Sequence, residues 1–249
     1  MADRSFRIKL LDEIRGLSII LMVISHICFD LTEIWGKNIV FFENPVIDFL
    51  HFFFRIVFIA ISGICCNLSK SNIKRGIIAF LCGMVITLVT FFMREDVDIV
   101  SFGILHFLGV SMILFGLLRK AIAKIPPFVG FLIFLLFFVF LHVPEGYMGI
   151  KDYIYEIPRN LYHTFLIPVG FPPADYLASD YFPLIPNMFI FFGFAIMARD
   201  IRSKKLPKFA YNGFIPFLGA AGRYSLIIYM AHQPIVYLIL YFLFDILKL

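Results

Sequence analysis

The sequence predicts an all-α integral membrane protein, a polytopic helical bundle of about seven transmembrane helices. Of its 249 residues, 61% are hydrophobic and only 16% are charged, and the mean hydropathy is +0.92. A soluble domain of this size could not bury that much apolar surface. The apolar stretches are roughly 17 residues or longer, as membrane helices require, and do not alternate as the strands of a barrel do.

Seven apolar stretches are long enough to be expected as spans, and residues 1–249 are expected to form one transmembrane domain. In the last stretch, Pro234 predicts a kink that frees a backbone carbonyl, which is tolerated only inside protein or at a cavity. The expected spans are 10–31, 46–68, 76–93, 99–118, 127–143, 182–198 and 215–244.

Lys and Arg indicate the orientation, because cytoplasmic loops carry an excess of both. With the N-terminus inside, the inner segments hold fourteen basic residues: Arg4, Arg7, Lys9, Lys70, Lys74, Arg75, Arg119, Lys120, Lys124, Arg199, Arg202, Lys204, Lys205 and Lys208. The outer segments hold five, namely Lys37, Arg94, Lys151, Arg159 and Lys248. We therefore expect the N-terminus in and the C-terminus out.

The longest loop, at about 144–181, is extracytoplasmic in this orientation. It is rich in proline and aromatic residues, and a loop of this length is seldom an idle linker. Its segment 159–170 is a candidate for a short interfacial or re-entrant helix. The alternative is a loop packed on the outer membrane surface.

The sequence argues against nucleic acid and metal ions as ligands. The net charge of +5 comes from residues at helix ends, so we expect no nucleic-acid partner. We expect no metal site either, because neither the cysteines nor the His, Asp and Glu residues show a convincing metal-ligand spacing. The four cysteines lie in apolar stretches, as small core residues do: Cys28, Cys65, Cys66 and Cys82.

The first stretch places a cation and an imidazole in one line. Arg15 and His26 are eleven residues apart, which returns a helix to nearly the same face after a rise of roughly 16 Å. A charged group at mid-membrane costs about 2.5–3.5 kcal/mol, so the presence of both residues in a membrane span needs a functional explanation. Arg15 could pair with Asp12 three residues before it, and it either snorkels to the inner interface or binds an anionic group such as phosphate.

Asp30 follows His26 by four residues on the same helix face. A carboxylate at that spacing can orient an imidazole and stabilise its cationic form, which is the elementary general-base pair. The alternative for His26 is a core histidine whose hydrogen bonds are satisfied.

Polar residues recur in three more stretches and suggest a hydrated cavity across much of the bilayer. The second stretch carries Asp48, His51 and Arg55, which could instead form a structural ion-pair network. His106 lies between two glycines and is either a helix contact or a cavity-lining residue. The last stretch places Ser225, Tyr229 and His232 on one face.

These residues carry a family resemblance. Arg15, ten residues and then His26, preceded by Asp12-Glu13-Ile14, resembles the Arg-x10-His signature of transmembrane acyltransferases. Four more segments narrow the match to bacterial proteins that share the catalytic domain of heparan-α-glucosaminide N-acetyltransferase, over nearly the whole chain. They are Arg55 to Gly63, Phe102 to Gly109, Phe171-Pro-Pro173 with Asp180 to Pro183, and Gly222 to Pro234.

The resemblance implies transfer of an acetyl group from cytosolic acetyl-CoA to an acceptor, a sugar or glycan, on the far side of a bacterial cytoplasmic membrane. His26 would be catalytic, with Asp30 beside it. The acetyl-CoA contacts would be Arg15, Arg55 and His106, and the acceptor contacts His51, Asp180, Tyr229 and His232. The expected partners are acetyl-CoA, the acceptor, the lipid bilayer and a second copy of the chain in a homodimer.

Two chemical routes stay open at this point, since His26 could either deprotonate the acceptor or take the acetyl group covalently. Both need a neutral His26 at the start. Two other function classes also stay open. Intramembrane His, Asp and Arg serve a proton-coupled transporter equally well, and the chain could be a non-catalytic scaffold in an envelope assembly.

Overall fold

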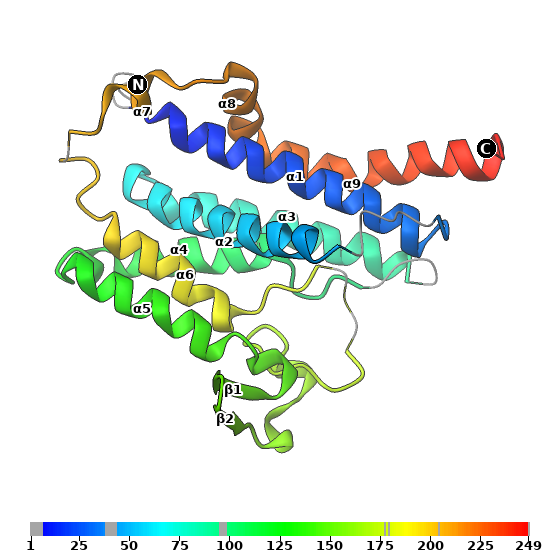
Figure 1. The fold of residues 1–249 in the computed structure, drawn as a ribbon, viewed down its shortest axis with the longest axis horizontal. Coiled ribbons are helices and arrows are strands. Elements are labelled where there is room, and N and C mark those ends of the chain that lie inside the picture. The colour runs from blue at the N-terminus through cyan, green and yellow to red at the C-terminus, as the bar shows by residue number, and fades with distance from the viewer. Residues whose placement is uncertain are drawn as a thin grey trace. The chain divides into compact units, whose positions relative to one another are not determined.

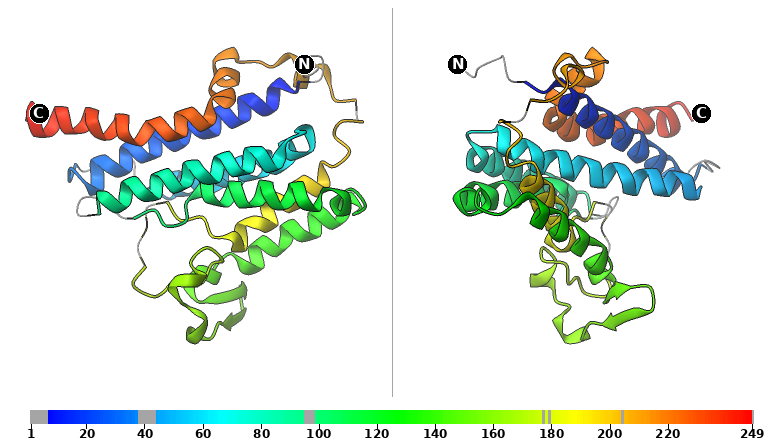
Figure 2. Two further views of the ribbon diagram at one scale, coloured as in Figure 1. Left: turned by 180° about the vertical axis from the view of Figure 1, so that it is seen from behind. Right: turned by 60° about the vertical axis from the view of Figure 1, so that its left-hand side comes forward.

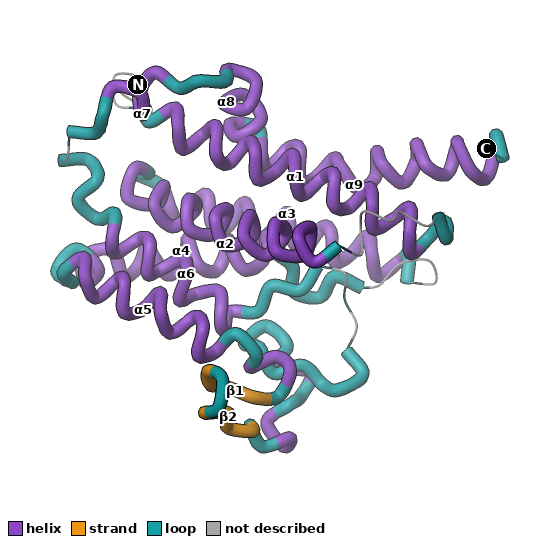
Figure 3. Tube along the Cα trace, viewed as in Figure 1, coloured by secondary structure: helices purple, strands orange, loops and turns teal. Residues whose placement is uncertain are grey.

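The computed structural model describes residues 7–37, 44–94, 99–176, 178, 180–203 and 205–248. Arg4 and Lys204, counted above among the inner basic residues, lie outside these ranges. The described part is mainly helical, with one two-stranded sheet and a long irregular segment between α5 and α6 (Figures 1 and 3). Its α-helices are α1 (Lys9–Glu33), α2 (Pro45–Leu68), α3 (Asn72–Phe92), α4 (Ile104–Ile122), α5 (Pro127–Phe140), α6 (Leu184–Met197), α7 (Lys208–Asn212), α8 (Pro216–Arg223) and α9 (Ser225–Tyr241).

Among the described residues, six helical segments are long and apolar enough to cross a bilayer: α1, α2, α3, α4, Pro127–Glu145 and Ser225–Ile246. The seventh expected span, 182–198, is the shorter apolar helix α6. Its 14 residues extend roughly 21 Å, less than the bilayer core of about 30 Å. The prediction of an all-α polytopic membrane protein is confirmed.

The prediction of one continuous helix over 215–244 is wrong. The chain leaves helical geometry at Tyr224, with φ −97° and ψ 16°, so that α8 and α9 are separate helices (Figure 1). Helix α9 continues through Pro234 and ends in a π-helical turn, Phe242–Ile246. The short helix α8 is rich in small residues and packs closely on α1.

Of the two alternatives for 159–170, a short helix or a loop, the structure shows the loop. That segment holds two single 3₁₀ turns, Arg159–Leu161 and Thr164–Leu166, between Pro158 and Pro168. Proline fixes φ and removes a backbone donor, so it interrupts a helix at either end of such a segment. A β-hairpin precedes them, built from β1 (Tyr147–Ile150) and β2 (Tyr153–Glu156) in antiparallel register.

The chain divides into two compact units. The terminal unit comprises Met1–Phe58 and Lys205–Leu249, and the central unit comprises Ile59–Lys204. In the terminal unit, α1 packs against α7, α8 and α9, as the blue and orange helices in Figure 2 show. In the central unit, α3 pairs with α4, α5 pairs with α6, and β1 contacts α5. Helix α2 contributes residues to both units.

Candidate active site

A histidine from α1 and one from α9 meet in the terminal unit. The ring centroids of His26 and His232 are 5.0 Å apart, with 54° between the ring planes. The half-buried His26 makes no hydrogen bond to another described residue. His232 is 8% exposed, and its Nδ1 lies 2.6 Å from the Tyr229 carbonyl oxygen, which can only accept a hydrogen bond. Nδ1 therefore carries a proton, and Nε2 of the neutral ring is an acceptor.

The turn of α9 that presents His232 also presents Tyr229, with 5.3 Å between their ring centroids. Residues three apart lie on the same helix face. Tyr229 thus lies beside His232, as the spacing predicts, and His232 in turn contacts His26 on α1.

Asp30 is nearly fully enclosed, at 1% exposure, and contacts an amide from α9. Its two carboxylate oxygens accept hydrogen bonds from Gln233 Nε2 at 3.0 and 2.9 Å. Among the described residues, Asp30 makes no hydrogen bond or ion pair with His26. The direct Asp30–His26 pairing that the spacing suggested is therefore not made in this structure, and Gln233 is a residue of the site that sequence reasoning missed.

A second histidine contact joins α2 to α1. His51 Nε2 lies 2.6 Å from Ser25 Oγ, which also lies 2.8 Å from the Leu21 carbonyl oxygen. The carbonyl accepts the hydroxyl proton, so Ser25 in turn accepts a hydrogen bond from His51. One turn further along α2, the guanidinium of Arg55 lies 5.2 Å from the centroid of the Phe52 ring.

Arg15 near the start of α1 has no hydrogen bond or ion pair with another described residue. The expected partner, Asp12, instead binds Arg7, with 2.7 Å between Nε and Oδ2. Neighbouring Glu13 is buried, and its carboxylate accepts the backbone N–H groups of Phe214 and Ile215 at 2.8–2.9 Å. Glu13 thus fixes the start of α8. The Arg15 guanidinium, without a hydrogen bond to a described residue, is available to bind another group.

Two glycines allow the backbones of α1 and α8 to touch. A Cβ at Gly16 would collide with the Leu218 carbonyl, and a Cβ at Gly222 would collide with the Asp12 carbonyl. This approach places α8 directly on the segment that carries Arg15. It also positions the start of α9, which follows α8 after a single residue.

His106 lies in the central unit and uses both ring nitrogens internally. Nδ1 accepts the backbone N–H of Gly103 at 3.2 Å, and Nε2 lies 3.3 Å from Thr87 Oγ1, which donates to the Val100 carbonyl oxygen. The ring is 2% exposed. These contacts favour the helix-contact alternative for His106 over a lining role.

Asp180 lies in the same unit, at the start of α4, where its Oδ2 accepts the backbone N–H of Ile104 at 3.3 Å. The next residue, Tyr181, donates its hydroxyl to the Ile167 carbonyl oxygen at 2.6 Å, and burial raises the pKa of this phenol. Asp180 thus ties the segment before α6 to α4, whereas the His26 contacts belong to the terminal unit.

The fold and this site define a polytopic helical membrane protein with a histidine pair between its first and last spans. The sequence model described as heparan-alpha-glucosaminide N-acetyltransferase, catalytic, matches residues 7–234. The chain therefore belongs to this acetyltransferase family, and the match runs through every candidate site residue from Arg15 to His232. No curated protein and no solved structure matches the chain.

Proposed function

We propose that the protein moves an acetyl group from cytosolic acetyl-CoA to an extracytoplasmic acceptor, a sugar or glycan, across a bacterial cytoplasmic membrane. The family match over residues 7–234 is the observation that carries the proposal. The contact between His26 and His232 supports it, because it gives the first and last spans a common chemical centre.

In this proposal His26 is the catalytic residue. Its ring makes no hydrogen bond to a described residue, so a nitrogen is available to a substrate. As a general base, His26 takes the proton of the acceptor hydroxyl or amine. The acceptor oxygen or nitrogen then bonds to the acetyl carbonyl carbon, the C–S bond breaks, and the coenzyme A thiolate leaves. As a nucleophile, its nitrogen first takes the acetyl group while the C–S bond breaks and the thiolate leaves, and the acetyl group then passes to the acceptor, whose proton goes to water.

Asp30 acts through Gln233 rather than on the imidazole directly. The paired carboxylate and amide join α1 to α9 one turn from His26 and next to His232. We therefore assign both side chains a positioning role, which keeps the two rings in contact. Tyr229, His232 and His51 are the proposed contacts for the acceptor.

The proposed acetyl-CoA contact is Arg15, since a guanidinium binds phosphate through paired hydrogen bonds and this one is not committed to a described carboxylate. Arg55 is the proposed second cation for the same ligand. Acetyl-CoA supplies the acyl group as a thioester. We also propose the predicted binding roles for His106, toward acetyl-CoA, and for Asp180, toward the acceptor. Their observed contacts lie within the central unit and suit a role in positioning α4.

The first test is binding of acetyl-CoA to purified protein in detergent, followed by thermal unfolding. Ligand that binds only the folded state at 100 times its Kd stabilises by about 2.7 kcal/mol, so the unfolding temperature should rise. Arg15→Gln should remove most of this rise. Lys9→Gln, which removes a charge from an exposed residue of the same helix, should keep it.

Two results would contradict the proposal. The first is an unfolding temperature that does not respond to acetyl-CoA, which a proton-coupled transporter or an envelope scaffold predicts. The second is an equal rise in the Arg15→Gln and Lys9→Gln proteins, which would place the ligand elsewhere.

A further inference from the structure

The outer hairpin has one face without a charged side chain. The register pairs Met148 with Tyr155 and Ile150 with Tyr153. Opposed residues share a face and successive residues alternate, so these four side chains lie on the same side. We call them the apolar hairpin face. Exposure is 50% for Ile150, 78% for Tyr153 and 64% for Tyr155.

The opposite face of the hairpin points toward the rest of its own segment. Tyr147, Ile154 and Glu156 line a pocket together with Glu145 and Arg159. Within this pocket the Tyr147 hydroxyl donates a hydrogen bond to Glu145 at 3.0 Å. The two faces therefore differ in charge, since the face with the pocket carries Glu156 and the apolar hairpin face carries no charged side chain.

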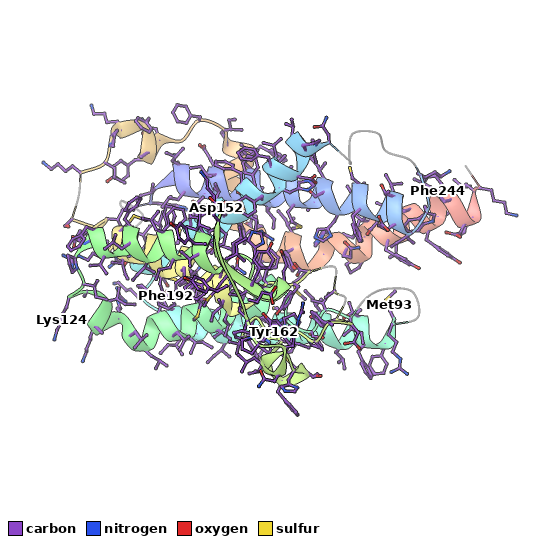
Figure 4. All side chains as sticks on the ribbon, turned by 60° about the horizontal axis from the view of Figure 1, so that its bottom comes forward. Met93, Lys124, Asp152, Tyr162, Phe192 and Phe244 are labelled. Carbon is purple, nitrogen blue, oxygen red and sulfur yellow. The ribbon has the colours of Figure 1, made fainter. Side chains whose placement is uncertain are left out.

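The hairpin also stands next to a surface that meets lipid. It begins immediately after the membrane-spanning segment Pro127–Glu145, and β1 contacts α5. Helix α5 exposes large apolar side chains along its length, among them Phe128, Phe131, Leu132 and Leu135. Figure 1 shows the hairpin beyond the end of α5, on the side away from α3 and α4, and Figure 4 marks Asp152 at its turn.

We propose that the apolar hairpin face lies in the interfacial layer of the leaflet at which α5 ends. Tyrosine is enriched at this depth, where its ring contacts acyl chains and its hydroxyl reaches water. An exposed apolar patch of this kind marks a membrane or protein contact, and the contact of β1 with α5, a candidate membrane span with exposed apolar side chains, favours the membrane. Phe165, in the same segment, is another exposed aromatic side chain, at 95% exposure.

Tryptophan fluorescence with brominated lipids tests this placement. Trp35→Phe removes the chain's single tryptophan, and Tyr153→Trp then adds a reporter on the apolar hairpin face. The matched control is Ile154→Trp, one residue away on the opposite face. In nanodiscs whose phosphatidylcholine is brominated near the headgroup end of its chains, Tyr153→Trp should lose more fluorescence than Ile154→Trp.

Tyr155→Trp is a second reporter on the same face and should behave like Tyr153→Trp, so the test does not depend on one variant folding. Equal quenching of reporters on both faces would overturn the proposal. The proposal would also be overturned if the brominated lipid did not quench the fluorescence but the fluorescence changed with the number of chains per nanodisc, because a second copy would then cover the face. The proposal does not depend on acetyltransferase activity.

Discussion

The residue contact with the clearest energetic consequence is that of Asp30 with Gln233. A carboxylate at 1% exposure is held through two hydrogen bonds from one amide. Removing a partner leaves a buried polar group unsatisfied, whereas removing both partners leaves only apolar contacts. Single and double substitutions of this pair therefore separate the free-energy cost of an unsatisfied buried group from the net contribution of the contact to stability.

We expect Gln233→Leu to destabilise the protein by about 1–3 kcal/mol or more, because it orphans the Asp30 carboxylate. Asp30→Leu combined with Gln233→Leu should cost less than the sum of the two single changes. Unfolding of the four proteins in one detergent measures this coupling. Strictly additive costs would show that the two side chains do not support one another.

At the scale of elements, the contact between α1 and α8 determines where the Arg15 end of the site lies. Glu13 fixes the first residues of α8, and the glycines at 16 and 222 let the two backbones meet. Since α9 follows α8 directly, the same contact helps position His232. Small residues at helix contacts are the usual way for membrane helices to approach closely.

Gly16→Ala and Gly222→Ala should each lower the unfolding temperature and the yield of folded protein, because the added methyl meets a backbone carbonyl that cannot rotate away. Gly219→Ala on the same helix is the control. Its Cβ would meet Glu13 Cγ at 3.6 Å, an ordinary contact, and Ala in a helix gains roughly 0.5–1 kcal/mol over Gly. Thermal unfolding that ranks Gly219→Ala with the other two would contradict this packing.

For the whole molecule, hydropathy alone predicted the membrane class and most helices, because a bilayer demands long apolar segments whose backbone groups are satisfied internally. Hydropathy averaged over a window did not reveal the break at Tyr224, because α8 and α9 are both apolar and form one continuous apolar stretch in the sequence. The hairpin was missed for another reason. Its two four-residue strands are short, although Tyr147–Ile150 and Tyr153–Glu156 around a two-residue turn do form a hairpin pattern.

The candidate site was predictable in part. Helical spacing and the family signature selected His26, Arg15 and His232, and the structure brings the two histidines together. Spacing along α1 could not show that Asp30 would bind Gln233, because a single sequence does not state which helices are neighbours. The same limit applies to Glu13, whose partners lie about 200 residues away in the chain.

The central claim is acetyl transfer through His26, and release of coenzyme A thiol from acetyl-CoA tests it most directly. Purified protein in nanodiscs is given acetyl-CoA with and without a panel of amino sugars and cell-wall glycans, beside the His26→Ala protein. We predict acceptor-stimulated thiol release that disappears in His26→Ala while its thermal unfolding stays normal. Near-normal release by a folded His26→Ala protein, or no release with any acceptor, would contradict the account.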